Sequence, residues 1–272
     1  MLADLKIRAR MFFDRVWGYR YFILSSIINE FRTQFVRSKL GGLWMLMHPL
    51  AQVLIYALIL SQIMRAKFQG VETPYAYPIY MLSGMVAWSL FSELLNRLIG
   101  LYINNANMMK KINFPKSTLI FISIGSSLVN FTLLIFMMFL IFGMLGHTPF
   151  YALIWLPLLI VVTLLLAIGL GLILGVINVF IRDVGQIMSI IMQFWFWLTP
   201  VVYMISIVPQ KYQMLLHLNP MTGVVIGFQN VLLYDKAPDF GLLIYPAILG
   251  LITTAVGLML FKRASLDMSD VL

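Results

Sequence analysis

The side chains that could carry chemistry are few, and the first of them are charges set inside long apolar runs. Glu93 and Arg97 lie four residues apart, a spacing that puts them on one face of a helix and allows an ion pair. Pairing lowers the cost of each charge in apolar surroundings. Two interpretations stay open for the pair: a gate or partner contact at the mouth of a pathway, or an internally neutralised pair in an interfacial turn. Arg182 and Asp183, which follow a later apolar run, have the same two interpretations.

Aromatic side chains form the second candidate set. Phe194–Trp197 is a run of four aromatic residues, and Tyr203 follows it shortly. Aromatic faces carry a partial negative charge that attracts C–H groups such as those of sugars, so these residues could line a conduit for a carbohydrate. Packing against lipid, or a belt at the membrane interface, is the alternative for each of them. The candidate conduit residues are Trp88, Phe91, Phe194, Trp195, Trp197 and Tyr203.

Several kinds of chemistry are excluded. The chain has no cysteine, which removes disulfides and thiolate chemistry, and its three histidines are isolated, without metal-ligand spacing. No phosphate-binding G-x-x-x-x-G-K-[ST] loop occurs, so the chain does not hydrolyse ATP by that route. No Ser/His/Asp set and no paired carboxylates indicate hydrolysis either. We therefore expect no enzyme activity, no metal and no cofactor in this chain.

The composition identifies the solvent of this chain as a lipid bilayer. Of its 272 residues, 61% are hydrophobic and 11% are charged, and the mean hydropathy is +0.94. Average soluble domains carry about a quarter charged residues. A soluble fold of this length could not hide so much apolar surface, which excludes an ordinary soluble enzyme and any disordered or fibrous class.

Six apolar segments are long enough for a membrane-spanning helix, which takes about 20 residues. A shorter run, Met221–Tyr234, with the stretch Tyr212–Leu218 before it, predicts a pair of short re-entrant or interfacial helices between the fifth and sixth spans. The fold class is therefore all-α and integral to the membrane. Gly169, Gly171 and Gly175 inside the fourth span predict close helix packing. The predicted spans are Trp44–Met64, Ile79–Ile99, Ser117–Gly143, Tyr151–Ile181, Gln186–Ile207 and Leu242–Phe261.

The N-terminal segment, residues 1–43, differs from the transmembrane domain, residues 44–272, in having an ordinary density of charge. Its apolar residues recur at helical spacing, which predicts an amphipathic helix in the membrane interface, with packing on a soluble partner as the alternative. Fifteen of the 19 Lys and Arg residues fall on one side of the predicted spans, and the positive-inside rule makes that side, with both termini, cytoplasmic. We therefore attribute the net charge of +9 to the orientation of the chain in the membrane, and we expect no nucleic-acid partner. The apolar positions of the predicted helix are Leu24, Ile27, Ile28, Phe31 and Phe35.

Several short motifs extend, in a particular order and spacing, along nearly the whole chain. They are Arg37–Trp44 with His48-Pro49, Tyr80–Gly84 with Trp88, Met109–Pro115, Phe180–Val184, Leu198–Tyr203 and Leu218–Thr222. With these motifs the chain resembles the permease subunits of type-2 ABC exporters. It is most similar to the polysaccharide branch that moves O-antigen, teichoic acid or capsule, and within that branch to the O-antigen export permeases.

The resemblance implies a homodimer in the bacterial inner membrane, surrounded by membrane lipids and bound to two copies of an ABC ATPase that holds the ATP and Mg²⁺. It implies that the loop Asn104–Lys116 couples the ATPase to the spans. It also implies that a polyprenyl-diphosphate-linked polysaccharide reaches the conduit from the bilayer near the N-terminal helix, where we expect basic residues to attract the diphosphate. Exporters of drugs or small lipids, and a membrane-embedded enzyme or scaffold, are the alternatives. The coupling residues are Asn107, Met108, Lys110, Lys111, Phe114 and Pro115, and the access residues are Arg32, Arg37, Lys39 and Trp44.

Overall fold

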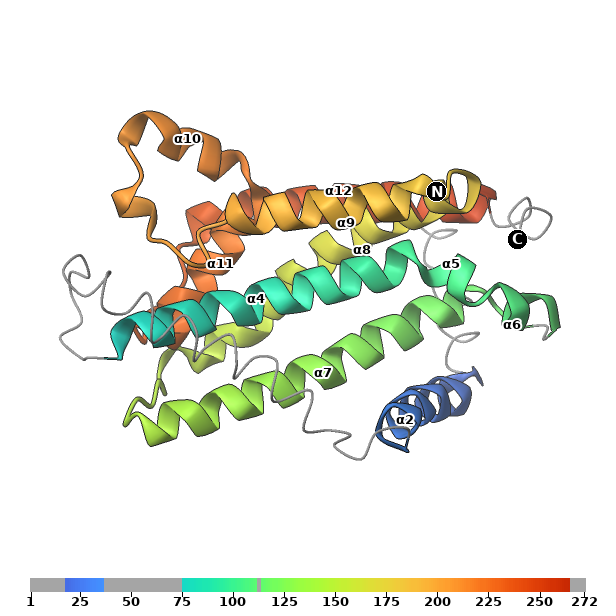
Figure 1. Cartoon of the computed structure of the whole chain (residues 1–272), viewed down its shortest axis with the longest axis horizontal. Coiled ribbons are helices and arrows are strands. Elements are labelled where there is room, and N and C mark those ends of the chain that lie inside the picture. Colours follow the sequence, from blue (N-terminus) through green and yellow to red (C-terminus); the bar gives the residue numbers. More distant parts are fainter. Residues whose placement is uncertain (1–17, 37–74, 112–113, 265–272) are drawn as a thin grey trace, which may run out of the picture.

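The computed structural model describes residues 18–36, 75–111 and 114–264, and all regular structure within these ranges is helical. Figure 1 shows the helices along the chain, with η denoting a 3-10 helix. They are α2 (Arg20–Val36), α4 (Ala76–Ile99), α5 (Leu101–Asn104), α6 (Ala106–Lys111), α7 (Ser117–Met144), η2 (Ala152–Trp155), α8 (Leu156–Phe180), α9 (Asp183–Trp197), η3 (Ile205–Ile207), α10 (Gln210–Leu218), α11 (Pro220–Leu232) and α12 (Phe240–Ala264).

Within the described residues, four stretches of helix are long and apolar enough to cross a membrane: α4, α7, η2 continued by α8, and α12. They agree within a few residues with the second, third, fourth and sixth predicted spans. The first predicted span, Trp44–Met64, lies outside the described residues, and so do the predicted access residues Arg37 and Lys39.

The prediction of a single fifth span over Gln186–Ile207 is wrong. α9 ends at Trp197 after 15 residues, and the chain from Leu198 to Met204 is not helical. Pro200 gives the physical reason, because proline has no N–H to donate and disfavours helical geometry in the residue before it. At 1.5 Å per residue, α9 is about 22 Å long, less than the roughly 30 Å apolar core of a bilayer.

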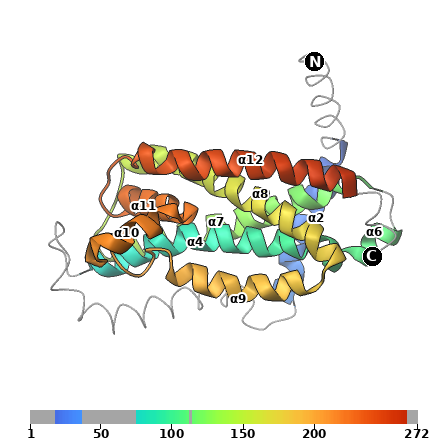
Figure 2. The ribbon, with the colours of Figure 1, turned by 90° about the horizontal axis from the view of Figure 1, so that it is seen from above.

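Two short helices, α10 and α11, occupy the region where the re-entrant pair is predicted. α11 is largely buried and packs on α4, α8 and α12, whereas α10 packs on α11 and extends away from the bundle (Figure 1). Both lie at the end of the bundle opposite α5 and α6 (Figures 1 and 2). Their re-entry into the membrane remains a prediction.

α8 is the central helix, with its most extensive contacts to α12 and α4. Gly169 faces α12 so closely that a Cβ atom there would overlap the hydroxyl of Thr253. Gly175 faces α4, where a Cβ atom would collide with the carbonyl oxygen of Leu98. The predicted role of these glycines in close helix packing is therefore confirmed.

α2 lies across the long axis of the bundle, beside the first half of α7 (Figures 1 and 2). The end of the bundle nearest to it carries Lys110 on α6, Arg182 before α9 and Arg263 on α12. The opposite end carries Lys211 on α10 and Lys236 after α11. The basic residues that the positive-inside rule assigns to one side of the membrane therefore gather at one end of the described structure.

Candidate functional site

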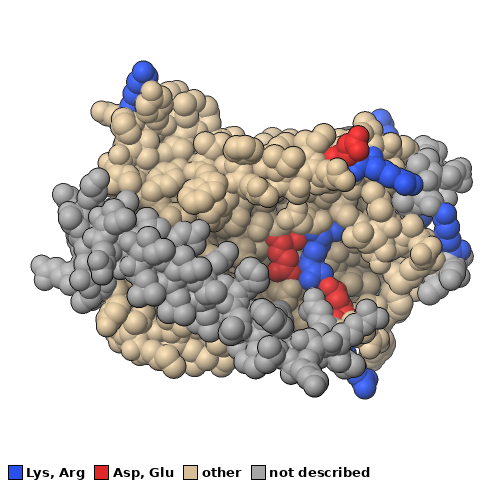
Figure 3. Space-filling model, viewed as in Figure 1, with Lys and Arg blue, Asp and Glu red and all other residues tan. Residues whose placement is uncertain are grey.

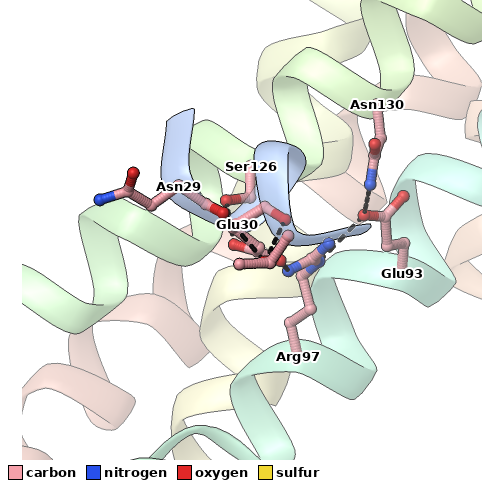
Figure 4. A network of polar contacts seen from close by, with 7 residues as sticks. Asn29, Glu30, Glu93, Arg97, Ser126 and Asn130 are labelled. Carbon is pink, nitrogen blue, oxygen red and sulfur yellow. Dashed lines mark hydrogen bonds and ion pairs between the residues drawn. The ribbon is translucent and has the colours of Figure 1, made fainter. Parts of the chain in front are cut away.

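Five polar side chains from three helices meet beside the last turns of α4, and we call them the ionic junction (Figure 4). Arg97 donates from Nε to Glu93 Oε1 at 2.9 Å and from Nη1 to Glu30 Oε1. Ser126 Oγ donates to Glu30 Oε2 at 2.6 Å. Asn130 Nδ2 donates to Glu93 Oε1. The junction thereby joins α2, α4 and α7 at one point.

Sequence spacing predicts one half of the junction and misses the other. The ion pair between Glu93 and Arg97 is confirmed, since residues four apart face each other on a helix. Glu30 is 67 residues from Arg97 along the chain, so no local pattern connects them. The one sequence feature that could have pointed to Glu30 is its isolation, since it is the only acidic residue between Asp14 and Glu72.

The junction holds two carboxylates against one guanidinium, so it carries a net negative charge. The side chains of Arg97, Glu93 and Glu30 are 24%, 27% and 32% exposed. Figure 3 shows acidic and basic side chains side by side in a hollow of this face. Each charge of the pair between Glu30 and Arg97 also has a second polar partner in the junction, Ser126 for Glu30 and Glu93 for Arg97. The junction can therefore exchange partners without leaving a charge buried and unpaired.

The N-terminal helix is present as α2, and α7 covers only part of its predicted apolar face. Ile27 lies against Gly125 of α7, where an added Cβ atom would overlap its side chain. Leu24 and Ile28, on the uncovered part of the same face, are 55% and 63% exposed. Phe31 is partly buried. The side chain of Phe35 lies outside the described part of the chain. An apolar stripe on the outer face of α2 suits the predicted membrane-interface position.

In the described part of the predicted coupling loop, the exposed side chains are polar. Asn107 and Lys110 are exposed on α6, whereas Met108 is partly buried against the chain's own core. Phe114 is also partly buried and packs on Phe22 of α2, with ring centroids 5.7 Å apart. Pro115 begins the approach to α7, and its carbonyl accepts a hydrogen bond from the backbone N–H of Thr118. The backbone of Lys111 belongs to α6, but its side chain is outside the described set.

Three of the candidate conduit aromatics pack on one another inside this chain. Trp88 and Phe91 of α4 have ring centroids 5.7 Å apart. Trp195 of α9 meets them edge-on, 6.4 Å from Trp88 and 5.2 Å from Phe91. Phe91 is fully buried, while Phe194 and Trp197 are 67% and 58% exposed. The structure thus separates an internal group that joins α9 to α4 from two aromatic side chains on the outer surface of α9.

The non-helical segment after α9 is tied to α4 by two tyrosines. Tyr77 donates its hydroxyl to the carbonyl oxygen of Val202 at 2.9 Å. Tyr80 donates to the carbonyl oxygen of Tyr203, also at 2.9 Å. Backbone without helical hydrogen bonds needs such donors when it is held inside a membrane protein. The candidate conduit residue Tyr203 takes part in this tie through its backbone, and its side chain is partly exposed.

Asn219 connects the same segment to α9 and α11. Its Oδ1 accepts from Trp195 Nε1 at 2.7 Å and from the backbone N–H of Met221 at 3.0 Å, which caps α11. Its Nδ2 donates to Thr199 Oγ1 at 2.9 Å. The cap is readable from sequence, since Asn followed by Pro220 is a common helix start, but the bond to Trp195 is not.

The turn between α8 and α9 holds Arg182 and Asp183 on the surface, both exposed. Asp183 stands in the first turn of α9, where a negative charge is favourable beside the helix N-terminus. Asn178 makes the internal contacts of this turn, donating to the carbonyl oxygen of Ile99 and accepting from the backbone N–H of Gly185, each at 2.9 Å. A gate role for Arg182 and Asp183 remains a prediction.

At the opposite end, Asp235 fastens the loop after α11 to the start of η2. Its φ of +48° is a left-handed conformation that aspartate tolerates better than most residues. Its carboxylate accepts from the backbone N–H of Ala152 at 2.8 Å, which holds the pKa of Asp235 below its usual value. His147 reinforces the contact through a ring nitrogen 2.7 Å from the carbonyl oxygen of Leu232.

The described helices form an apolar bundle with four helices long enough to cross a membrane and a polar junction near one end. Residues 22–233 match the ABC-2 type transporter family, and the chain belongs to that family. Membership implies a partner ATPase, because these permease subunits generally have no ATPase site of their own.

Curated relatives extend along most of the chain. The O-antigen export system permease protein RfbA of Klebsiella pneumoniae is 24% identical over 257 residues, which cover 94% of this chain and 96% of that protein. RfbA of Myxococcus xanthus is 26% identical over 226 residues, covering 82% and 85%. The polysialic acid transport protein KpsM of Escherichia coli is 23% identical over 236 residues, covering 86% and 90%.

Proposed function

We propose that this chain is the permease subunit of an ATP-driven exporter that moves lipid-linked, O-antigen-type polysaccharide across the bacterial inner membrane. The observation that carries the proposal is the nearly full-length similarity to RfbA export permeases within the ABC-2 family. Two copies of the chain would form the conduit, and two copies of the partner ATPase would hold and hydrolyse ATP with Mg²⁺. Both termini would lie in the cytoplasm.

α6 is the part of the described structure best suited to receive the partner ATPase. Its exposed Asn107 and Lys110 offer hydrogen bonds and a positive charge. Met108 and Phe114 would hold α6 in place against the permease rather than enter the partner, because both are partly buried within this chain.

The exposed aromatic residues of α9 are the best candidates for contact with sugar. Phe194 and Trp197 present large apolar faces on the outer surface of the helix. Trp195, packed on Trp88 and Phe91, would fix the position of α9 from behind. Aromatic faces of this kind bind many different sugars without reading their sequence, which suits export of a long polymer.

The lipid end of the substrate would approach the bundle beside α2. Arg32 is exposed on the outer side of this helix. Together with Arg37, Lys39 and Trp44, which lie outside the described residues, it would attract a diphosphate and place the lipid at the membrane interface.

Capsular polysaccharide is the second candidate substrate, because KpsM is a polysialic acid transport protein and covers most of the chain. It would use the same subunit arrangement. The two candidates differ in the glycan alone, so one assay can compare them.

The proposal is tested with the full permease and its partner ATPase reconstituted in lipid vesicles. Polyprenyl-diphosphate-linked O-antigen or a capsular glycan is added to the outer leaflet, and its protection from an added glycosidase is measured with ATP. We expect ATP-dependent protection of the O-antigen substrate, and no protection with a non-hydrolysable ATP analogue. Protection of the capsular glycan alone would select the second candidate. Transport of small lipids or drugs with no protection of either glycan would contradict the proposal.

A further inference from the structure

α2 is attached to the rest of the chain in two different ways. Phe22 and Ile27 hold it by apolar contact to Phe114 and to α7. Glu30 holds it to α4 through the ion pair with Arg97. The apolar contacts depend on the fit of the side chains and hold α2 on α7. In the ionic contact, by contrast, each charged side chain has a second polar partner nearby that can replace the first.

Opening the pair between Glu30 and Arg97 leaves neither charge without a partner. Arg97 keeps the hydrogen bond from its Nε to Glu93, which belongs to the same helix and moves with it. Glu30 keeps the hydroxyl of Ser126 on α7, the helix on which α2 rests. Both side chains are also only partly buried within the described chain, so neither is enclosed when the pair opens. The arrangement therefore avoids the large penalty of an abandoned buried charge.

We propose that the pair of Glu30 and Arg97 is a releasable latch between α2 and α4, and that its opening and closing passes the cycle of the partner ATPase to α4. The proposal rests on the proposed function, which supplies the partner. Phe114, three residues after the end of α6, packs on Phe22 near the start of α2, and in this scheme it passes a displacement of α6 to α2. Glu30 and Arg97 are positioning residues in this scheme, acting through the helices that they join.

α4 carries the displacement further, because it also bears Trp88 and Phe91. These two rings pack on Trp195 of α9 in the second and third turns before Arg97. A rotation or shift of α4 therefore moves the helix whose outer surface presents Phe194 and Trp197. The latch, α4 and the internal aromatic group form one continuous path of contacts from α2 to α9. In this scheme the latch is the two-state element that coupling between sites requires.

The test compares Glu30→Gln with Asn29→Ala in the full complex with its ATPase. Asn29 is the neighbouring exposed residue and points away from the junction (Figure 4), so its replacement controls for a change on α2. We expect Glu30→Gln to keep ATP hydrolysis within about twofold and to lower the polysaccharide exported per ATP by at least about fivefold, the lower end of typical coupling effects. Asn29→Ala should match the wild type in both measurements.

Arg97→Lys is the second variant, because an ammonium keeps the charge but cannot make the two separate contacts of a guanidinium. It should lower export per ATP in the same direction. A disulfide between Ile27→Cys and Gly125→Cys, introduced into each variant of this cysteine-free chain, reports whether α2 still lies on α7.

The outcomes separate the two proposals. A wild-type complex that exports no glycan refutes the proposed function. A wild-type complex that exports glycan, with Glu30→Gln and Arg97→Lys both indistinguishable from Asn29→Ala, refutes the latch. Loss of the disulfide together with loss of ATP hydrolysis in both variants assigns the pair a purely structural role, and this also refutes the latch.

Discussion

Arg97 shows how much of a functional cluster a local pattern can reveal. Its pairing with Glu93 follows from a spacing of four residues on a helix, and the structure contains that pair. Glu30, Ser126 and Asn130 could not be assigned from sequence, because their contacts depend on how α2, α4 and α7 are placed relative to one another. The same holds for Asn219, whose capping role is readable locally while its bond to Trp195 depends on the packing of α9.

Asp235 gives a residue-scale prediction about pH. Its pKa is lowered by hydrogen bonds from backbone N–H groups, first that of Ala152, so it binds a proton less readily in the folded protein than in the unfolded chain. The resulting stabilisation is complete above the unfolded-state pKa of about 3.9 and is lost as pH falls through the lower folded-state value. Asp235→Asn keeps an acceptor oxygen and tolerates the same backbone conformation, but it removes the titration.

The measurement is the thermal unfolding midpoint of the purified permease in detergent, followed from pH 7 down to the acid limit of folding. The wild type should lose more stability below about pH 4 than Asp235→Asn does. Parallel pH curves for the two proteins would show that this carboxylate contributes nothing to the acid response.

At the scale of the helices, prediction succeeded where length and hydropathy are both strong. α4, α7, α8 and α12 match predicted spans, since about 20 apolar residues in a bilayer have few alternatives to a helix. α9 shows the limit of this reasoning. The residues after Trp197 are apolar enough to continue a span, but Pro200 stops the helix, and donors from α4 and α11 satisfy the backbone instead. A hydropathy profile contains no information about hydrogen-bond donors that come from other helices.

The contact between α8 and α12 allows a prediction for the glycines. Gly169→Ala places a methyl group against Thr253 and the backbone of α12, so the two helices have to separate. We expect the free energy of unfolding to fall by about 1–3 kcal/mol, the usual cost of overpacking a core. Gly143→Ala on α7 is the matched control, because a Cβ atom there meets nothing within 4 Å.

Unfolding of both variants in mixed micelles, with increasing denaturing detergent, measures the difference. Gly143→Ala should stay within about 0.5 kcal/mol of the wild type, as surface substitutions usually do. Equal stability of the two variants would mean that α8 and α12 can separate without cost.

At the scale of the whole molecule, sequence counting anticipated a separation of charge that the structure displays. Among the described basic residues assigned to the cytoplasmic side, Lys110 lies on α6, Arg182 before α9 and Arg263 at the end of α12, and these elements share one end of the bundle (Figures 1 and 2). The count needs only the order of spans and loops, without any knowledge of packing, and which end of the bundle faces the cytoplasm stays a prediction. It survives the shortening of α9, since α10 and α11 still emerge at the opposite end.

Orientation follows as a prediction for the intact protein. The chain has no cysteine, so one introduced cysteine reports one position. Lys236→Cys, exposed after α11, should react with a membrane-impermeant maleimide in intact cells whose outer membrane has been opened. Arg263→Cys, exposed at the end of α12, should react only after the inner membrane is permeabilised. The reverse pattern would invert the proposed topology.

The shortness of α9 bears on the lipids as well as on the protein. A helix of about 22 Å cannot match a hydrocarbon layer of roughly 30 Å, and the mismatch is relieved when neighbouring lipid tails compress. Such compression costs a fraction of a kcal/mol for each Å of mismatch between helix and bilayer, and it concerns the lipids next to the helix. Wherever α9 borders lipid, we expect the bilayer to be thinner than beside the longer helices, so that a large amphiphile passing there would have less hydrocarbon to cross.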